Sequence, residues 1–209
     1  MSRAAYLLAV EQGADGFECD LRLTKDRVLV CWHDPSMKRV ADCDLLISES
    51  TLAEIQAAYP VLTLEELLNI ALEHGKHLAL ETKHPVPTHG AVEAELLKTL
   101  AIYKDAIDKA GIFVSIMSFS WFAIARLRRS GWNTVYLVPH RWLAKLSPGL
   151  SIGPDVGAIK KLNRAGLRHQ RLFVWTANSP EEILLCREKG VDVMMTDRPA
   201  YARTILESV

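Results

Sequence analysis

The segment GADGFECDLRLTKDRVLVCWHDP, residues 13–35, contains two extended runs on either side of a short polar turn. Residues 16–23 predict one strand and residues 28–32 predict a second, because apolar residues recur within each run. Side chains along a strand alternate between its two faces, so Glu18 and Asp20 share one face. The first strand therefore projects two carboxylates in one direction, whereas its other face is apolar.

The rest of the chain alternates between strand-like and helix-like segments. Thr63 and Glu66 have the spacing of a capping box at the start of a helix over residues 63–73, and Gly75 ends that helix. Further strands are predicted at residues 77–81, 112–117, 135–138, near 151, 172–175 and 193–196, and further helices at 3–12, 91–110, 122–130, 155–165 and 180–189. Repeated alternation of strand and helix is typical of a parallel α/β protein.

Two architectures fit this alternation, an open doubly wound sheet and a (β/α) barrel. The open sheet usually carries a phosphate-binding G-x-G-x-x-G or G-x-x-x-x-G-K-[ST] loop after an early strand, and this chain has neither motif. Polar or amphipathic residues instead lie at or just beyond the ends of several strands: Glu18, Asp20, His33, Glu81, Lys83, Ser118, Trp175, Asn178 and Asp197. Because a barrel brings such strand ends to one mouth, we expect a TIM-type (β/α)8 barrel that forms a single domain over residues 1–209.

The composition excludes several classes of function. The chain has 209 residues, 49% of them hydrophobic and 24% charged, which is enough for one well-buried globular domain. Lys plus Arg number 25 and Asp plus Glu number 25, so no overall field attracts nucleic acid or an acidic bilayer. The four cysteines lack metal-ligand spacing, which is typical of reduced thiols in a cytoplasmic protein. No apolar run reaches the roughly 18 residues of a membrane span, so we expect no stable membrane insertion.

A third carboxylate is expected near the first two. Glu81 ends the apolar strand at residues 77–81 and can bring another oxygen ligand to Glu18 and Asp20. Three carboxylates without a cysteine or histidine partner favour a hard divalent ion, Mg²⁺ or Ca²⁺, over zinc. The alternative is that these acids form structural ion pairs with Lys83 and Arg22.

Two further residues have the chemistry of a phosphate site. Lys83 lies on the same side of its strand as Glu81, where a positive charge beside a metal is able to contact a phosphate. His33 follows an apolar run at a strand-to-loop junction, where an imidazole is able to act as a general acid or base. The alternative interpretations are a solvated lysine and a surface or capping histidine.

Read as one string, residues 13–35 resemble the glycerophosphodiester phosphodiesterase family. Members of that family carry G-A-D-x-x-E-x-D, then L-T-x-D-x-x-x-V, then H-D-P at this spacing, and the match is highly specific. The similarity continues at residues 62–66, 81–83, 118–119, 174–178, 190–192 and 196–199. It therefore covers essentially the whole chain.

The resemblance implies a TIM-type barrel that hydrolyses glycerophosphodiesters to an alcohol and glycerol 3-phosphate. It also implies a divalent metal, Mg²⁺ or Ca²⁺, held by Glu18, Asp20 and Glu81 at the matching positions. The ion then offsets and polarises the phosphate charge, while imidazoles move protons between nucleophile and leaving alkoxide.

The resemblance assigns the remaining site residues as well. His33 is implied as one of two acid/base histidines, Lys83 as a phosphate contact and Trp175 as an aromatic wall for the glycerol end, with a core aromatic as the alternative for Trp175. The other histidines match no catalytic position of the family and are interpreted as surface or loop residues: His74, His77, His84, His89, His140 and His169.

The chain departs from the family at its N-terminus. Members open with a strand that ends in H-R-G, followed by P-E-N-T, and neither motif occurs here. One barrel unit of about thirty residues is therefore expected to be missing. By resemblance, that unit supplies the second catalytic histidine, a phosphate-binding arginine and a further glutamate. Because one general acid or base typically contributes about 10²- to 10⁴-fold in rate, impaired activity is expected.

A barrel without its first strand leaves two strand edges unpaired, which predicts oligomerisation or low solubility. A misplaced start site is the simplest explanation, and a longer form would then have room for a signal peptide. Two other functions stay open. One is a non-catalytic barrel that binds phosphate or a phospholipid headgroup, and the other is a related phosphodiesterase that acts on sphingomyelin-like or lysophospholipid substrates.

Overall fold

The computed structural model describes residues 1–138, 150–162 and 171–208. The strands are β1 (Gly16–Leu23), β2 (Leu29–Cys31), β3 (His77–Thr82), β4 (Val114–Ser118), β5 (Asn133–Tyr136), β6 (Ser151–Ile152), β7 (Phe173–Val174) and β8 (Val193–Met194). The helices are α1 (Arg3–Glu11), α2 (Lys38–Ala41), α3 (Leu52–Ala58), α4 (Leu64–His74), α5 (Ala91–Ala110), α6 (Trp121–Leu127), α7 (Pro180–Glu188) and α8 (Pro199–Glu207), with 3-10 helices η1 (Ile47–Glu49) and η3 (Val156–Lys161).

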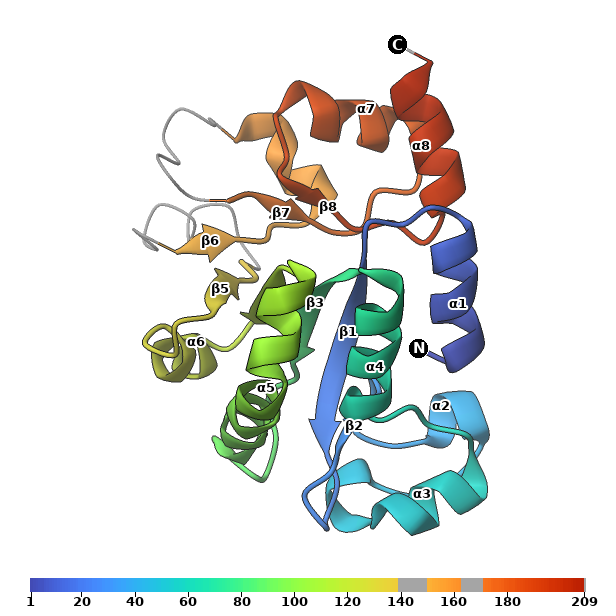
Figure 1. Cartoon of the computed structure of the whole chain (residues 1–209), viewed down its shortest axis with the longest axis vertical. Helices are drawn as coiled ribbons and strands as arrows, with labels where there is room; N and C mark the ends of the chain where they lie inside the picture. The colour runs from blue at the N-terminus through green and yellow to red at the C-terminus, as the bar shows by residue number, and fades with distance from the viewer. Residues whose placement is uncertain (139–149, 163–170, 209) are drawn as a thin grey trace.

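The parallel strands follow one another in space in the order in which they occur in the chain. A six-stranded sheet has the order β2-β1-β3-β4-β5-β6, and β7 pairs with β8 in a second sheet. All neighbours are parallel except β2, which pairs antiparallel with β1. A parallel bridge between Ile152 and Leu172 continues the six-stranded sheet toward β7. This sequential parallel wall, with helices between its strands, is the arrangement expected of a (β/α) barrel (Figure 1).

The wall is open between its two ends. Among the described residues no strand pairs β8 with β1. Arg203 of α8 donates from Nη2 to the backbone oxygen of Gly13 at 2.5 Å and to Oδ1 of Asp15 at 2.8 Å, just before β1. The oligomerisation expected from exposed strand edges stays a prediction.

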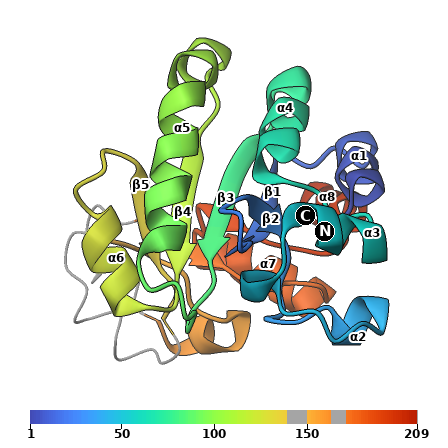
Figure 2. The ribbon, with the colours of Figure 1, turned by 90° about the horizontal axis from the view of Figure 1, so that it is seen from below.

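Buried apolar side chains attach the helices to the sheet. Leu80 of β3, Leu96 of α5 and Ile116 of β4 are fully buried in one core cluster, and α4 packs against α5. Figure 2 shows α4 and α5 side by side along the strands β1, β3 and β4. Burying one such side chain stabilises the fold by about 1.5–3 kcal/mol, so this packing holds the strand ends in place.

Capping residues set where several helices begin. Thr63 and Glu66 form the predicted capping box of α4, and Gly75 ends that helix with a left-handed φ of 61°. A β-carbon is disfavoured in this conformation, which is why glycine occurs at the end of the helix. Thr51 and Glu54 form a second capping box, at the start of α3.

The structure differs from the sequence predictions in several elements. The expected helix at residues 155–165 is a 3-10 helix at Val156–Lys161, in which the carboxylate of Asp155 accepts from the backbone of Gly157, and residues 163–165 lie outside the described residues. The strand expected at residues 135–138 is shifted to Asn133–Tyr136, and β7 and β8 are shorter than predicted. Helices α2, α3 and α8 were not predicted. In the described parts of the chain, no helix is long and apolar enough to cross a membrane.

Candidate functional site

Three carboxylates meet at the pairing of β1 with β3. The parallel register sets Asp20 opposite Glu81, and Glu18 lies two residues earlier on the same face of β1. One carboxylate oxygen from each of the three residues lies within 4.8 Å of the others. The structure thus brings together the acids that the sequence alternation assigned to one face.

This cluster carries more negative charge than its surroundings neutralise. Burial raises the pKa of Glu18 to about 8, with further increases from the charges of Asp20 and Glu81. Burial also raises the pKa of Glu81. At Glu18 the loss of hydration and the neighbouring negative charges therefore outweigh the nearby cations.

Lys83 is the cation that lies directly in the cluster. Its Nζ is 2.8 Å from Oε1 of Glu81 and 3.2 Å from Oδ1 of Asp20. Burial lowers the pKa of Lys83, but the hydrogen bond to Glu81 and the charge of Asp20 outweigh burial and raise it. The alternative of a structural ion pair therefore holds for Lys83, whereas Arg22 donates its Nε to the backbone oxygen of His33 at 2.8 Å. The guanidinium of Arg22 also interacts electrostatically with Asp20 and Glu81, so three carboxylates lie beside two cations.

His33 follows β2 and is tied to the cluster through the backbone. Trp32 donates its backbone N–H to the oxygen of Asp20 at 2.9 Å, which sets the start of the His33 loop beside β1. Burial raises the pKa of Glu81, and His33 opposes this increase only weakly, so the imidazole lies within electrostatic reach of that carboxylate. Its side chain is 55% exposed, as a group that exchanges protons with a substrate needs to be.

The sequence prediction missed the residue that orients this histidine. Oδ1 of Asp34 lies 2.6 Å from Nδ1 of His33, and Nε of Arg39 donates to Oδ2 of Asp34 at 2.6 Å. These hydrogen bonds lower the pKa of Asp34 to about 2. A carboxylate that holds Nδ1 makes Nε2 the nitrogen that transfers protons. The signal was present, because Asp34 is the middle residue of the H-D-P motif.

Trp175 lies at the end of β7 and is half-buried. Its Nε1 donates to the backbone oxygen of Gly153 at 2.9 Å, and its ring centroid is 5.4 Å from that of Phe119 in an edge-to-face contact. The indole is therefore fixed by packing and still presents surface to solvent. This position is compatible with both predicted roles of Trp175, an aromatic wall and a core residue.

Among the histidines without an assigned role, His84 makes the strongest contact. Its Nε2 is 2.5 Å from Oε1 of Glu93, and Oε2 of Glu93 is 3.1 Å from Nη2 of Arg126. His77 accepts a hydrogen bond at Nδ1 from the backbone of Phe113 at 3.1 Å. His140 and His169 lie outside the described residues.

The cluster fits a hard divalent cation by the chemistry of its donors. Glu18, Asp20 and Glu81 offer oxygen ligands, which Mg²⁺ and Ca²⁺ prefer. Their mutual repulsion supplies the electrostatic reason for binding one. The residues present thus satisfy the requirements of the metal site that the motif predicts.

Comparisons with known proteins identify the family of the chain and agree with its fold. The model of the glycerophosphoryl diester phosphodiesterase family matches residues 2–139. A probable glycerophosphodiester phosphodiesterase 1 of Mycobacterium tuberculosis (strain H37Rv) is 31% identical over 240 residues, which cover 98% of this chain and 86% of the relative. A glycerophosphodiester phosphodiesterase of Caldanaerobacter subterraneus is 26% identical, with 94% of this chain and 87% of the relative covered.

Solved structures share the fold. A phosphodiesterase of Oleispira antarctica, solved with the product sn-glycerol-3-phosphate, has a TM-score of 0.74 and 21% identity, and the match covers 96% of this chain and 88% of that one. A glycerophosphodiester phosphodiesterase of Thermotoga maritima has a TM-score of 0.76 and 22% identity, with 97% and 90% covered. The predicted (β/α) barrel class is confirmed by this agreement.

Proposed function

The chain belongs to the glycerophosphoryl diester phosphodiesterase family, and from this premise we propose that it hydrolyses glycerophosphodiesters to an alcohol and sn-glycerol 3-phosphate. One observation carries the proposal. Glu18, Asp20 and Glu81 converge within 4.8 Å, with Lys83 paired to two of them. This combination offers a cation site and a phosphate contact at a single place.

The three carboxylates are proposed as ligands of one divalent ion, Mg²⁺ or Ca²⁺. When bound, such an ion offsets the charge of the phosphodiester and polarises its phosphorus–oxygen bonds. Lys83 supplies a positive charge beside the carboxylates, which an anionic diester needs in order to approach an acidic cluster.

His33 is proposed as the acid/base residue. Asp34 holds Nδ1 at 2.6 Å, so Nε2 is the atom that takes a proton from the attacking group or gives one to the leaving alkoxide. Trp175 is proposed as the wall against which the glycerol carbons pack, supported by the fixed position of its indole.

A direct assay tests the hydrolysis. Release of glycerol 3-phosphate from glycerophosphocholine is measured with Mg²⁺ or Ca²⁺ and after chelation with EDTA. We expect metal-dependent release that Glu81→Ala abolishes. The control is Glu73→Ala, which removes an exposed glutamate of α4 and is expected to have no effect. Absence of release with either ion, or full activity in Glu81→Ala, contradicts the proposal.

A second candidate function rests on the ion pairs of Lys83 with Glu81 and Asp20, which form without any contribution from His33. Binding of phosphate or a phospholipid headgroup without hydrolysis needs only the carboxylates and Lys83. Binding of glycerophosphocholine without product release, in the same assay mixture, would identify this function.

A further inference from the structure

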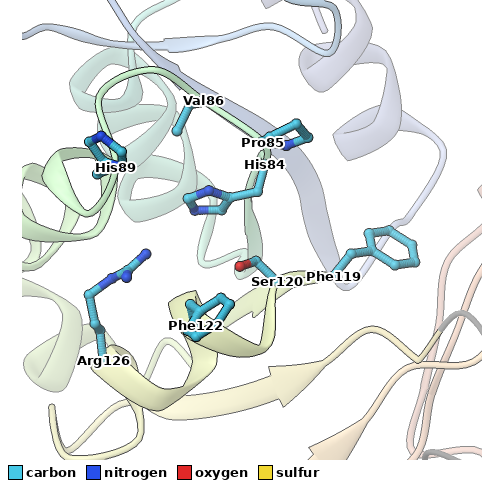
Figure 3. A pocket seen from close by; sticks show the side chains of 8 residues that line it. All are labelled: His84, Pro85, Val86, His89, Phe119, Ser120, Phe122 and Arg126. Atoms are coloured by element: carbon cyan, nitrogen blue, oxygen red, sulfur yellow. The ribbon is translucent and has the colours of Figure 1, made fainter.

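A pocket of about 490 Å³ is lined by residues that follow the C-terminal ends of β3 and β4. His84 directly follows Lys83 beyond β3, and Phe119 directly follows the last residue of β4. The side chains that line the pocket include His84, His89, Phe119, Ser120, Phe122 and Arg126 (Figure 3). The pocket extends from the strand ends outward over the start of α6.

Phe119 joins this pocket to the proposed glycerol side of the site. Its ring lines the pocket and also contacts the ring of Trp175, at a centroid distance of 5.4 Å. If glycerol packs against Trp175, the other substituent of the phosphate would pass Phe119 and enter this pocket. In Figure 3, Phe119 points away from the other labelled side chains, while Arg126 and His89 lie toward the opposite end.

The lining has a positive character. Among the described residues that line the pocket, Arg126 is the charged group, accompanied by two imidazoles and no acid. Both His84 and Arg126 contact Glu93, an acid that is 1% exposed and is not part of the lining. Arg126 keeps 42% of its side chain exposed, so its guanidinium is accessible to a ligand as well as to Glu93.

We propose that this pocket receives the alcohol portion of the phosphodiester and selects an alcohol that bears a carboxylate or another negative group. The inference rests on the proposed function. Arg126 offers charge-assisted N–H donors to an anion, while the rings of Phe119 and Phe122 contact the carbon skeleton. A quaternary ammonium gains attraction from the rings but meets the like charge of Arg126, so the pocket favours the anion.

Two substrates that differ by one carboxylate test this selection. We compare kcat/KM for glycerophosphoserine and glycerophosphoethanolamine, with glycerol 3-phosphate release as the assay. We expect glycerophosphoserine to be preferred by about tenfold, the size of one charge-assisted contact. Arg126→Gln is expected to bring the ratio to about 1, mainly by lowering kcat/KM for glycerophosphoserine by about tenfold.

Matched variants separate recognition from folding. Arg129→Gln removes the same charge from an exposed position just after α6, outside the pocket lining, and is expected to retain the preference. Arg126→Lys keeps the charge and is expected to retain part of it. Because Arg126 also binds buried Glu93, the double variant Glu93→Gln/Arg126→Gln replaces Arg126→Gln if thermal melting shows that the single variant is unfolded.

Binding by calorimetry tests the pocket independently of catalysis. The dissociation constants of both diesters are measured in the presence of Mg²⁺. A tenfold preference in Kd that Arg126→Gln removes supports the inference even where neither diester is cleaved, an outcome that overturns only the proposed function. Equal kcat/KM and equal Kd for the two diesters, or a preference unchanged in Arg126→Gln, overturns the inference.

Discussion

Two clusters of charged side chains differ in how far their positive charges offset their negative charges. At the β1–β3 pairing, Lys83 pairs with Asp20 and Glu81, and burial raises the pKa of the third carboxylate, that of Glu18, to about 8. At the start of α5, the single carboxylate of Glu93 is shared by His84 and Arg126. Burial alone raises the pKa of Glu93, but the hydrogen bond from His84 and the charge of Arg126 outweigh burial and lower it.

The difference separates a structural ion pair from a binding site. A buried acid that is fully paired needs no ligand, and removal of one partner of the pair is strongly destabilising. A buried acid that is left under-compensated retains affinity for a cation from outside. The acid cluster is therefore where a metal is expected, whereas the Glu93 cluster holds the loop after β3 and α6 together.

The largest expected effect is the loss of unfolding free energy when the Glu93 cluster is disrupted. Replacing Glu93 by Leu leaves His84 and Arg126 without their shared acceptor, so the free energy of unfolding is expected to fall by about 3 kcal/mol. Glu81→Gln, in the unbalanced cluster, is expected to change it by less than about 1 kcal/mol without metal, because it also relieves repulsion. Urea denaturation of both variants in EDTA measures the contrast, and equal losses would contradict it.

Addition of metal is expected to have the next largest effect. Mg²⁺ at a hundredfold excess over its Kd raises the free energy of unfolding by about 2.7 kcal/mol through mass action. Glu81→Gln is expected to remove this stabilisation, and Arg126→Gln is expected to keep it. Thermal melts with and without Mg²⁺ make the measurement. Stabilisation that survives in Glu81→Gln would place the ion elsewhere.

The smallest effect is a difference in pH dependence between the clusters. Burial raises the pKa of Glu18 from its ordinary value of 4.5 to about 8, so its contribution is present below pH 4.5 and is lost as pH rises through 8. The metal-free protein is therefore expected to lose at least about 1 kcal/mol between pH 5 and pH 9. Glu18→Gln should flatten this alkaline loss.

The lowered pKa of Glu93 has the opposite sign. Its contribution is present above pH 4.5 and is lost as pH falls through the folded pKa, so Glu93→Gln should flatten the acid limb. Unfolding free energies measured from pH 3 to pH 9 in EDTA compare the two variants. Identical pH profiles for both variants would show that the clusters do not differ in balance.

Local pattern predicted part of the fold well. The capping box at Thr63 and the strand alternation at Glu18 and Asp20 depend on residues only a few positions apart, and both occur in the structure. The start of α3 has the same capping signal, and Pro199 at the first turn of α8 is a usual helix start, so these two missed helices were accessible to the same rules.

Contacts between residues far apart in the chain could not be predicted from such local patterns. His84, Glu93 and Arg126 come from a loop and two different helices, and nothing in their spacing predicts that they meet. The Asp20–Glu81 pairing depends on the register between β1 and β3, and a slip of one residue would send these side chains to opposite faces.

By itself the sequence determined the succession of the parallel strands and most of the helices between them, the family and the residues that carry acidic, basic and imidazole groups. These follow from local periodicity, capping and motif spacing. Only the tertiary structure decided which charges are balanced, because burial and the distance to each partner set the pKa of a carboxylate, and both arise from packing between segments far apart in the chain.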